Sequence, residues 1–555
     1  MISVLLNWAY IALTTICLGL GFGQFSKKVL HYSIKSLDSI IVAGLVIATV
    51  YSQVFSLFYK VGAVANLILI CCCVTILIVI RKSIKMDMRQ YLSEYTKIKG
   101  GMVIILVLVW AYCTSRGYIH YDTDLYHAQS IRWIEEYGIV PGLGNLHLRL
   151  AYNSSVFALS ALYSMKFLVG ESLHTINGFV ALVLSLEALR VIKGVRQRCL
   201  QLADYARLAA IYYLTLICDE VVSPASDYLI MCTIFFIIIK WLKIMEETRD
   251  EEERIVPYSL LCVCGVFAVS LKLTAGLILL LVITPAYLLI KHKKWKEIII
   301  FLVMGIIVIA PWVARTVVLS GYLIYPLSGL DLFDFDWEIA KHRVIHDERE
   351  IKVWGRGLND ITKIDVSFVE WMPNWFTTLL SSTEKILVIG DCVAIIMMGI
   401  IGIAAVVRKA YQKKEYTVVM FAVISSYLFW LFSAPLVRYG YAYVLLVCVL
   451  TGGYFIQKVD KRWLTNIVCV FIILIGIWKL TSLANYMLSV SGEDFYLAQK
   501  QYGSYEVIMY EINGEEFYSP IYTDRVGYDA FPSSPDGRIV EFRGDSIADG
   551  FRNCE

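Results

Sequence analysis

Residues 102–133 read MVIILVLVWAYCTSRGYIHYDTDLYHAQSIRW. The first twelve residues are apolar, and a group of ionisable side chains follows, comprising Arg116, His120, Asp122, Asp124 and His127. Ionisable side chains next to the hydrocarbon core are costly and usually have a function. The stretch therefore predicts a membrane span with a functional site at its end.

The composition extends this interpretation to the whole chain. The 555 residues are 58% hydrophobic and 17% charged, whereas soluble domains carry roughly 25% charged residues. Apolar stretches of about 17 to 25 residues, the length that a spanning helix needs, recur from end to end. We expect an all-α polytopic membrane protein. Its first apolar run, Ser3 to Leu20, lacks a charged segment before it and reads as a retained anchor rather than a cleaved signal peptide.

The cysteines and the net charge indicate no cofactor or partner. The 14 cysteines are scattered through apolar runs without the spacing of a zinc site or a disulfide framework. The formal net charge of +3 says little, because the sign of each charge depends on its loop.

Basic clusters set the expected orientation, because short cytoplasmic loops carry an excess of lysine and arginine. If all of them are cytoplasmic, the N-terminus and the loop that holds Asp122 lie outside. The apolar segment Ser155 to Gly170 should then be a juxtamembrane helix in the outer interface, since a crossing would invert every later basic loop. The clusters lie at Lys27, Lys28 and Lys35; at Arg81, Lys82, Lys85 and Arg89; at Arg196 and Arg198; at 291–296; at Arg408, Lys409, Lys413 and Lys414; and at Lys458, Lys461 and Arg462.

These rules predict about fourteen spans. They divide the chain into additional N-terminal spans (1–100), a membrane core (101–484) with external loops 116–172 and 315–385, and an external C-terminal tail (485–555). The expected spans are near 3–20, 38–58, 61–80, 101–115, 173–192, 207–222, 227–245, 257–271, 274–290, 297–314, 386–406, 416–433, 442–457 and 466–484.

Several ionisable residues should gather on the outer face. Asp122 and Asp124 form a carboxylate group there, and three cations, Lys272, Arg315 and Arg438, run against the positive-inside tendency. Each also has a plainer interpretation, as a solvated loop acid or as an anchor whose charge reaches the interface along its own stem. An anionic head group held by the cations, next to a carboxylate base, would explain both the positive charges and their place on the outer face.

The expected chemistry follows from the location. No nucleotide sugar is available outside the cytoplasmic membrane, so an anionic substrate at this depth is best explained as a lipid phosphate. A carboxylate would deprotonate an acceptor hydroxyl that attacks the anomeric carbon, and the cations would stabilise the leaving phosphate. No cofactor is expected; a divalent cation is possible but not indicated, because DTD supplies only two carboxylates.

At these residues the sequence resembles the GT-C superfamily of polytopic membrane glycosyltransferases, such as the aminoarabinose transferases and protein mannosyltransferases. Asp122, Tyr126 and Pro141 in DTDLYHAQSIRWIEEYGIVP have the spacing of the family's first external loop, although Thr123 replaces the usual Glu. The resemblance spans roughly 101–450 and implies a GT-C-like helical bundle. It implies an inverting transferase that uses a polyprenyl-phosphate-linked sugar, with Asp122 favoured as base and Asp124 as the alternative.

Further stretches carry the resemblance to other residues. PWVARTVVLSGYLIYP implies a phosphate contact for Arg315, and VRYGYAYVL implies one for Arg438. The usual His-Pro-Pro is missing, and Asn153 lies near its place. The expected substrate-binding residues are Tyr126, His127, Asn153, Lys272, Arg315 and Arg438.

The whole chain also resembles poorly characterised bacterial membrane proteins linked to surface polysaccharides, through YDTDLYHAQSIRWIEEYGIVPGLGNLH and FRGDSIADGF. The expected partners are the donor lipid, a glycan, lipid or protein acceptor, and the bilayer, with no nucleic acid. Two alternatives remain. A polymerase or ligase would use polyprenyl-diphosphate glycans, and a lipid-linked sugar flippase would place charges in mid-span rather than at one face.

Overall fold

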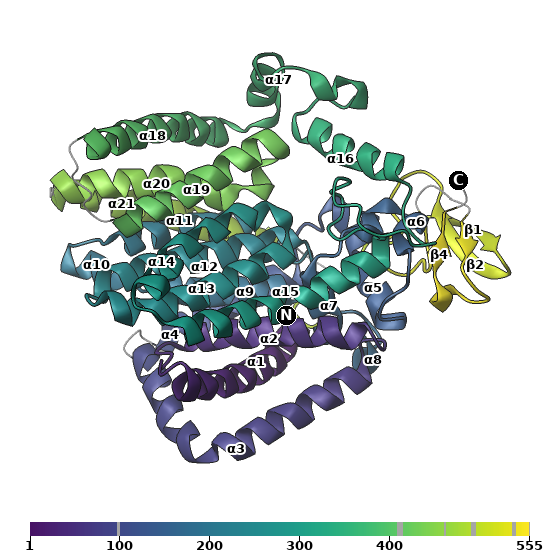
Figure 1. The fold of residues 1–555 in the computed structure, drawn as a ribbon, viewed down its shortest axis with the longest axis horizontal. Helices are drawn as coiled ribbons and strands as arrows, with labels where there is room; N and C mark the ends of the chain where they lie inside the picture. The colour runs from purple at the N-terminus through teal and green to yellow at the C-terminus, as the bar shows by residue number, and fades with distance from the viewer. Residues whose placement is uncertain (97–99, 408–413, 460–461, 490–494, 535–539, 554–555) are drawn as a thin grey trace.

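The computed structural model describes residues 1–555 except 97–99, 408–413, 460–461, 490–494, 535–539 and 554–555. Long helices run side by side along one direction (Figure 1). In the described part of the chain, nine helices are long and apolar enough to cross a membrane, as expected of a multi-pass membrane protein. They are Ile2–Val29, Leu37–Ser56, Ala63–Lys82, Ser226–Glu247, Glu251–Leu271, Leu273–Lys291, Trp295–Ser320, Ser382–Ile403 and Glu415–Ser433.

The centre of the bundle is α12 (Ser226–Glu247), whose residues from Ser226 to Leu242 are all buried. It packs against α9 (Ile176–Ala188), α11 (Leu202–Ile217), α13 (Glu251–Leu271) and α20 (Tyr441–Val459). A helix that is apolar all round is typically surrounded by protein or lipid, and here protein surrounds it.

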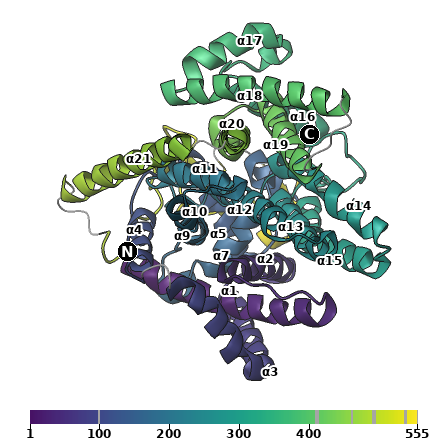
Figure 2. The ribbon, with the colours of Figure 1, turned by 90° about the vertical axis from the view of Figure 1, so that its left-hand side faces the viewer.

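Two groups of helices flank this centre on opposite sides (Figure 2). One side has α1 (Ile2–Val29), α2 (Leu37–Ser56) and α3 (Ala63–Thr96); the other has α18 (Ser382–Val407), α19 (Lys414–Ser433) and α21 (Arg462–Ser489). Gly19 and Gly44 let α1 and α2 touch, because a Cβ there would lie 2.0 Å from the Ile40 carbonyl oxygen and 1.8 Å from that of Thr15.

The two ends of the bundle differ in what they carry. At one end, here called the tail end, the N-terminal amine of Met1 donates to the Phe495 carbonyl, and Lys500 donates to the Ser115 carbonyl, so the tail lies beside the start of loop 116–172. The opposite end, here called the basic end, holds Lys27 and Lys28 at the end of α1 and Lys291 at the end of α14 (Ile283–Lys291). Arg408, Lys409, Lys413 and Lys461 lie outside the described residues.

The first part of segment 155–170 is shorter and more buried than the interfacial helix that we expected, whereas its second part is exposed. The segment folds as α7 (Ser155–Tyr163) and α8 (Lys166–Val169), and every residue of α7 is buried. Nine helical residues extend about 14 Å, too short for the roughly 30 Å hydrocarbon core. Helix α7 packs against α2 and α5 (Ala128–Glu136), which cover the face that would otherwise meet lipid.

Several expected spans also differ in detail. The span near 274–290 begins as a 3₁₀ helix, η3 (Leu273–Val282), and continues as α14. Helices α9 and α11 have 13 and 16 residues, shorter than the roughly 20 that a full crossing needs. The division into about fourteen crossings therefore stays a prediction. The remaining helices are α4 (Gly100–Ser115), α6 (Leu143–Leu146), η2 (Leu148–Ala151), α10 (Val191–Gln197), α15 (Trp295–Ser320), α16 (Lys341–Gly355), η4 (Ile361–Asp365), α17 (Phe368–Asn374), η5 (Trp375–Leu379) and η7 (Ile547–Asp549).

The C-terminal tail contains the described sheet structure. Strands β1 (Val507–Ile512) and β2 (Glu515–Pro520) form an antiparallel hairpin, closed by Asn513 and Gly514 with φ of 52° and 83°. Both positive values are typical of the type I′ turn that joins tight hairpins. Strands β3 (Glu541–Phe542) and β4 (Phe551–Arg552) pair beside it. Phe517 and Phe551 pack with Trp133, so this small core fixes the tail to loop 116–172.

Candidate active site

Asp122 lies at the tail end, directly before a short π-helical turn, η1 (Thr123–His127). One guanidinium nitrogen of Arg438, Nη2, lies 2.5 Å from Asp122 Oδ2. Arg438 belongs to η6 (Val437–Tyr439), the short turn between α19 and α20. The Asp122 and Arg438 side chains keep 22% and 26% of their surface exposed, so an incoming ligand can reach this ion pair.

A second carboxylate, that of Asp227, lies near the same arginine as Asp122. Asp227, in the first turn of α12, forms an ion pair with Lys272, the residue between α13 and η3. Arg438 Nε also lies 3.8 Å from Asp227 Oδ2. Asp122, Asp227, Lys272 and Arg438 are called the carboxylate–cation cluster below. Two cations here balance two carboxylates.

Aromatic and imidazole rings line the cluster. The ammonium of Lys272 lies 3.4 Å from the centre of the Tyr439 ring, a cation–π contact. Arg438 Nη2 also donates to the Tyr439 hydroxyl at 3.0 Å. His120 accepts from Arg438 Nη1 and from the backbone N–H of Asp122, which lies 3.2 Å from its Nδ1. These contacts hold the guanidinium in one orientation.

The charges of the cluster follow from its environment. Burial raises the pKa of the Asp122 carboxyl, but the Arg438 guanidinium and the nearby histidines outweigh it and leave the pKa below its ordinary value. Burial lowers the pKa of His120, and Arg438 lowers it further. At neutral pH Asp122 is therefore an ionised carboxylate beside a neutral imidazole.

Asp124 has a different environment, although it is two residues away. Its carboxylate accepts from the Gly503 N–H at 3.0 Å and from the Tyr505 hydroxyl at 2.8 Å. Its carbonyl accepts from the N–H groups of Val526 and Gly527. Only 5% of Asp124 is exposed. It fastens the tail to η1.

Tyr126 and His127 follow on the same turn. Burial raises the pKa of Tyr126, and the Asp122 carboxylate raises it further. Burial lowers the pKa of His127 to about 3, so its imidazole is neutral. His127 Nδ1 lies 3.3 Å from Thr123 Oγ1, and only 3% of the residue is exposed. Of the two, Tyr126 is better placed to reach a substrate.

Arg315 and Asn153 form a separate buried contact. Arg315 Nε donates to Asn153 Oδ1 at 3.1 Å, and Nη1 donates to the Ser56 hydroxyl and to the Gly138 carbonyl. The Asn153 amide donates to the Trp312 carbonyl at 2.9 Å. These partners are neutral, and Arg315 is 2% exposed. The structure thus brings Asp122, Lys272 and Arg438 together and places Arg315 elsewhere.

Sequence reasoning missed Asp227, His120 and Tyr439. Asp227 begins an apolar span at the end where Lys272 lies, and this position was a usable signal. His120 lies two residues before Asp122, and Tyr439 directly follows Arg438, but only the folded contacts show that both touch Arg438. Within the described ranges, no group of three or more His, Cys, Asp or Glu side chains is placed to hold a metal ion.

Comparison with protein families found one match. The model of a family described as a domain of unknown function (DUF8201) matches residues 1–445. The chain belongs to this family. Comparison with curated proteins and with solved structures found no match. The family match includes α1, α2 and α3, which the sequence analysis set apart as additional spans, and it contains all four residues of the carboxylate–cation cluster. Helix α21 and the tail lie beyond it.

Proposed function

We propose that the protein is an inverting glycosyltransferase, which moves a sugar from a polyprenyl-phosphate donor to an acceptor at the outer face of the cytoplasmic membrane. The observation that carries the proposal is the pairing of the accessible Asp122 carboxylate with Arg438, beside the Lys272–Asp227 pair. A base and two phosphate-binding cations then lie within one cluster, at the end of the bundle opposite the basic loops.

Donor binding exchanges the partners of the cations. A phosphate takes the place of the carboxylates at Arg438 and Lys272, because a guanidinium binds phosphate oxygens with two parallel hydrogen bonds. Asp122 then loses its cation and gains a nearby anion. Both changes raise its pKa, which makes the carboxylate a stronger base only when the donor is bound.

The transfer step balances without a further reactant. The acceptor hydroxyl gives its proton to Asp122, and its oxygen forms a bond to the anomeric carbon on the face opposite the phosphate. The bond between that carbon and the phosphate oxygen breaks, and its electron pair leaves with the polyprenyl phosphate. Arg438 and Lys272 stabilise the developing charge, so the leaving group needs no proton.

The location of the cluster supports a lipid-linked donor. Lys272 and Asp227 lie at the ends of apolar helices, and we expect the phosphate of a membrane-anchored lipid to lie at the same level. The tail packs above η1 through Asp124 and is available to contact an acceptor glycan, lipid or protein. Assembly of a surface polysaccharide or glycoconjugate would fit this arrangement.

Arg438→Lys tests the phosphate role. The full-length protein is reconstituted into vesicles with a set of polyprenyl-phosphate-linked sugars, and release of polyprenyl phosphate is measured. Lysine keeps the charge but loses the paired hydrogen bonds, so the rate should fall about 10²–10³-fold. Arg196→Lys, the same change at an exposed arginine of the basic end, is the matched control. Equal rates in both variants would contradict the proposal, and turnover of polyprenyl-diphosphate glycans alone would replace it with the polymerase or ligase alternative.

A further inference from the structure

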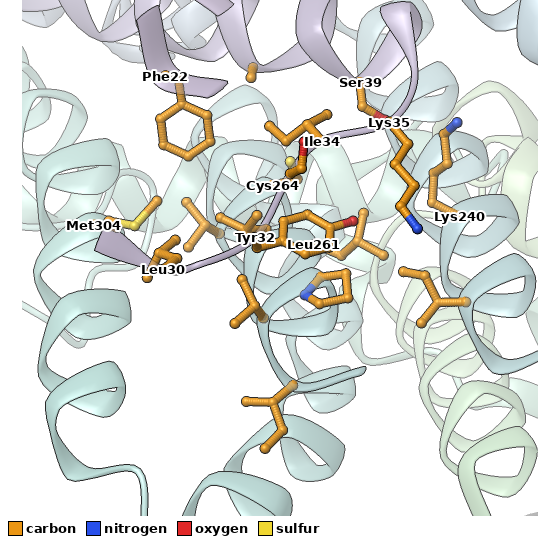
Figure 3. Close-up of a pocket in the computed structure, with 18 of the residues that line it drawn as sticks. Phe22, Leu30, Tyr32, Ile34, Lys35, Ser39, Lys240, Leu261, Cys264 and Met304 are labelled. Atoms are coloured by element: carbon orange, nitrogen blue, oxygen red, sulfur yellow. The ribbon is translucent and has the colours of Figure 1, made fainter. Parts of the chain in front are cut away.

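A second cavity lies at the basic end, away from the carboxylate–cation cluster. Its volume is 970 Å³, near the upper end of the about 300–1,000 Å³ typical of small-molecule pockets. The turn 30–36 after α1 and the helices α2, α12, α13 and α15 form its walls. Figure 3 shows Tyr32 and Lys35 projecting from this turn into the cavity, with Lys240 nearby.

The apolar part of the cavity lies between α2 and α15 and is called the wedge below. At the tail end these helices touch, because Arg315 donates to Ser56, the last residue of α2. Towards the basic end they separate, and Val46 of α2 and Met304 of α15 line the cavity between them. The walls at this depth are apolar: Val42, Val46, Ile47, Val50, Leu260, Leu261, Met304, Ile307 and Val308.

An apolar wedge between membrane helices suits hydrocarbon. Water needs polar partners that these walls do not offer, and packed proteins keep few voids of this size. Five helices that are long and apolar enough to cross a membrane contribute lining residues, namely α1, α2, α12, α13 and α15, so a lipid chain can enter the cavity from the bilayer.

The mouth of the cavity is polar and carries both signs of charge. Lys240 is already paired with Asp38 and Glu187, Lys243 with Glu247, and Lys294 with Glu252. Lys35 is exposed and forms no ion pair within the described part of the chain. The lining carboxylates without an ion pair in the described part of the chain are Asp250, Glu253 and Glu297.

We infer that this cavity binds a membrane phospholipid with a zwitterionic phosphoethanolamine head group. An acyl chain fills the apolar wedge, the phosphate pairs with Lys35, and the ammonium faces the carboxylates of the 247–253 turn. Asp250, Glu253 and Glu297 have no ion pair in the described residues and would repel a purely anionic head group, whereas the ammonium of a zwitterion can pair with them. The inference uses no residue of the carboxylate–cation cluster and stands apart from the proposed transferase activity.

The test is lipid retention. The full-length protein is reconstituted into vesicles of equal parts phosphatidylethanolamine and phosphatidylglycerol, extracted in mild detergent and weighed by native mass spectrometry. The wild-type protein should keep one phosphatidylethanolamine. Lys35→Ala should weaken retention about tenfold, the effect of losing one charge-assisted contact. Lys28→Ala, which removes an exposed lysine of the same end outside the cavity, should have no effect.

A second variant fills the cavity. Ala43 of α2 lines the wedge, and Ala43→Trp should abolish retention, whereas Leu13→Trp on the exposed face of α1 should not. Should Ala43→Trp not fold, the surface change Lys35→Ala decides alone. Loss of all lipid from the wild type, preference for phosphatidylglycerol, or equal retention by wild type and Lys35→Ala would overturn the inference.

Discussion

Asp122 and Asp124 are two residues apart, yet their surroundings suit them to different roles. Asp122 meets cations and remains accessible, whereas Asp124 is enclosed by hydrogen bonds from the tail. The sequence favoured Asp122 as base only through its position in a family-like spacing. The structure supplies a physical reason to prefer it, because a base must be able to reach an acceptor.

The exchange of Arg438 from Asp122 to phosphate should be visible in the pH dependence. In the free protein the pKa of Asp122 lies below its ordinary value. Because kcat/KM reports the ionisation of the free protein, it should stay constant down to a pH below about 3.9, as long as the protein stays folded. In the donor complex the pKa is raised, so kcat should fall at a higher pH. If kcat and kcat/KM fell at the same acidic pH, Arg438 would have to stay paired with Asp122 when the donor binds.

Asp124→Asn should act on stability more than on chemistry. The amide keeps one accepting oxygen but places an NH₂ group at the other position, so one of the bonds from Gly503 and Tyr505 is lost, at a cost of about 1–2 kcal/mol. A lower unfolding temperature with a nearly unchanged kcat is the expected outcome. Tyr505→Phe, which removes one of the same bonds from the tail side, should lower it similarly. A stable Asp124→Asn protein without turnover would instead make Asp124 the base.

At the scale of elements, Arg315 connects α15, α2 and the turn at Gly138. Lysine cannot reach these acceptors in the same geometry. If Arg315 only positions the helices, Arg315→Lys should lower the unfolding temperature and leave donor affinity unchanged. If it binds phosphate, as the resemblance implies, donor affinity should fall while stability changes little. Calorimetry and donor titration on the same preparation separate the two.

Hydropathy located the elements whose apolar sequence is long. The helices Ser226–Glu247, Glu251–Leu271, Ser382–Ile403 and Glu415–Ser433 lie close to the spans expected from sequence. The count of basic loops placed 155–170 in the outer interface and did not predict the burial of 155–163, because packing against α2 and α5 is not encoded in the local sequence. The hairpin at Asn513–Gly514 went unnoticed, although an Asn-Gly pair between alternating residues is a usable hairpin signal.

The candidate site was predictable only in part, because the sequence indicates the side on which a charge lies but not the residues that it touches. Counting basic loops placed Asp122, Lys272 and Arg438 on one side, and the structure brings them into one cluster. Charge counting cannot tell which cations touch, so it grouped the buried Arg315 with them. It also overlooked Asp227, whose pairing with Lys272 depends on the register of α12 against α13.

At the scale of the whole molecule, the two ends of the bundle should face different compartments. A periplasm-active reporter fused after the C-terminus of the full chain should be active, because the tail lies with loop 116–172. A reporter inserted in the loop at residues 198–201, at the basic end, should be inactive. The reverse pattern, with the reporter at 198–201 active and the C-terminal reporter inactive, would mean that segment 155–170 crosses the membrane. Equal activity at both sites would contradict the assignment of the two ends to different compartments.

The most direct test of the central claim is single-turnover transfer by Asp122→Asn, measured together with donor binding. The amide cannot take the acceptor proton, so turnover should fall about 10²–10⁴-fold. Donor affinity should stay the same or improve, because Arg438 no longer has to leave a carboxylate in order to bind phosphate. Wild-type turnover in Asp122→Asn would contradict the account, and so would a loss of donor binding that matches the loss of rate.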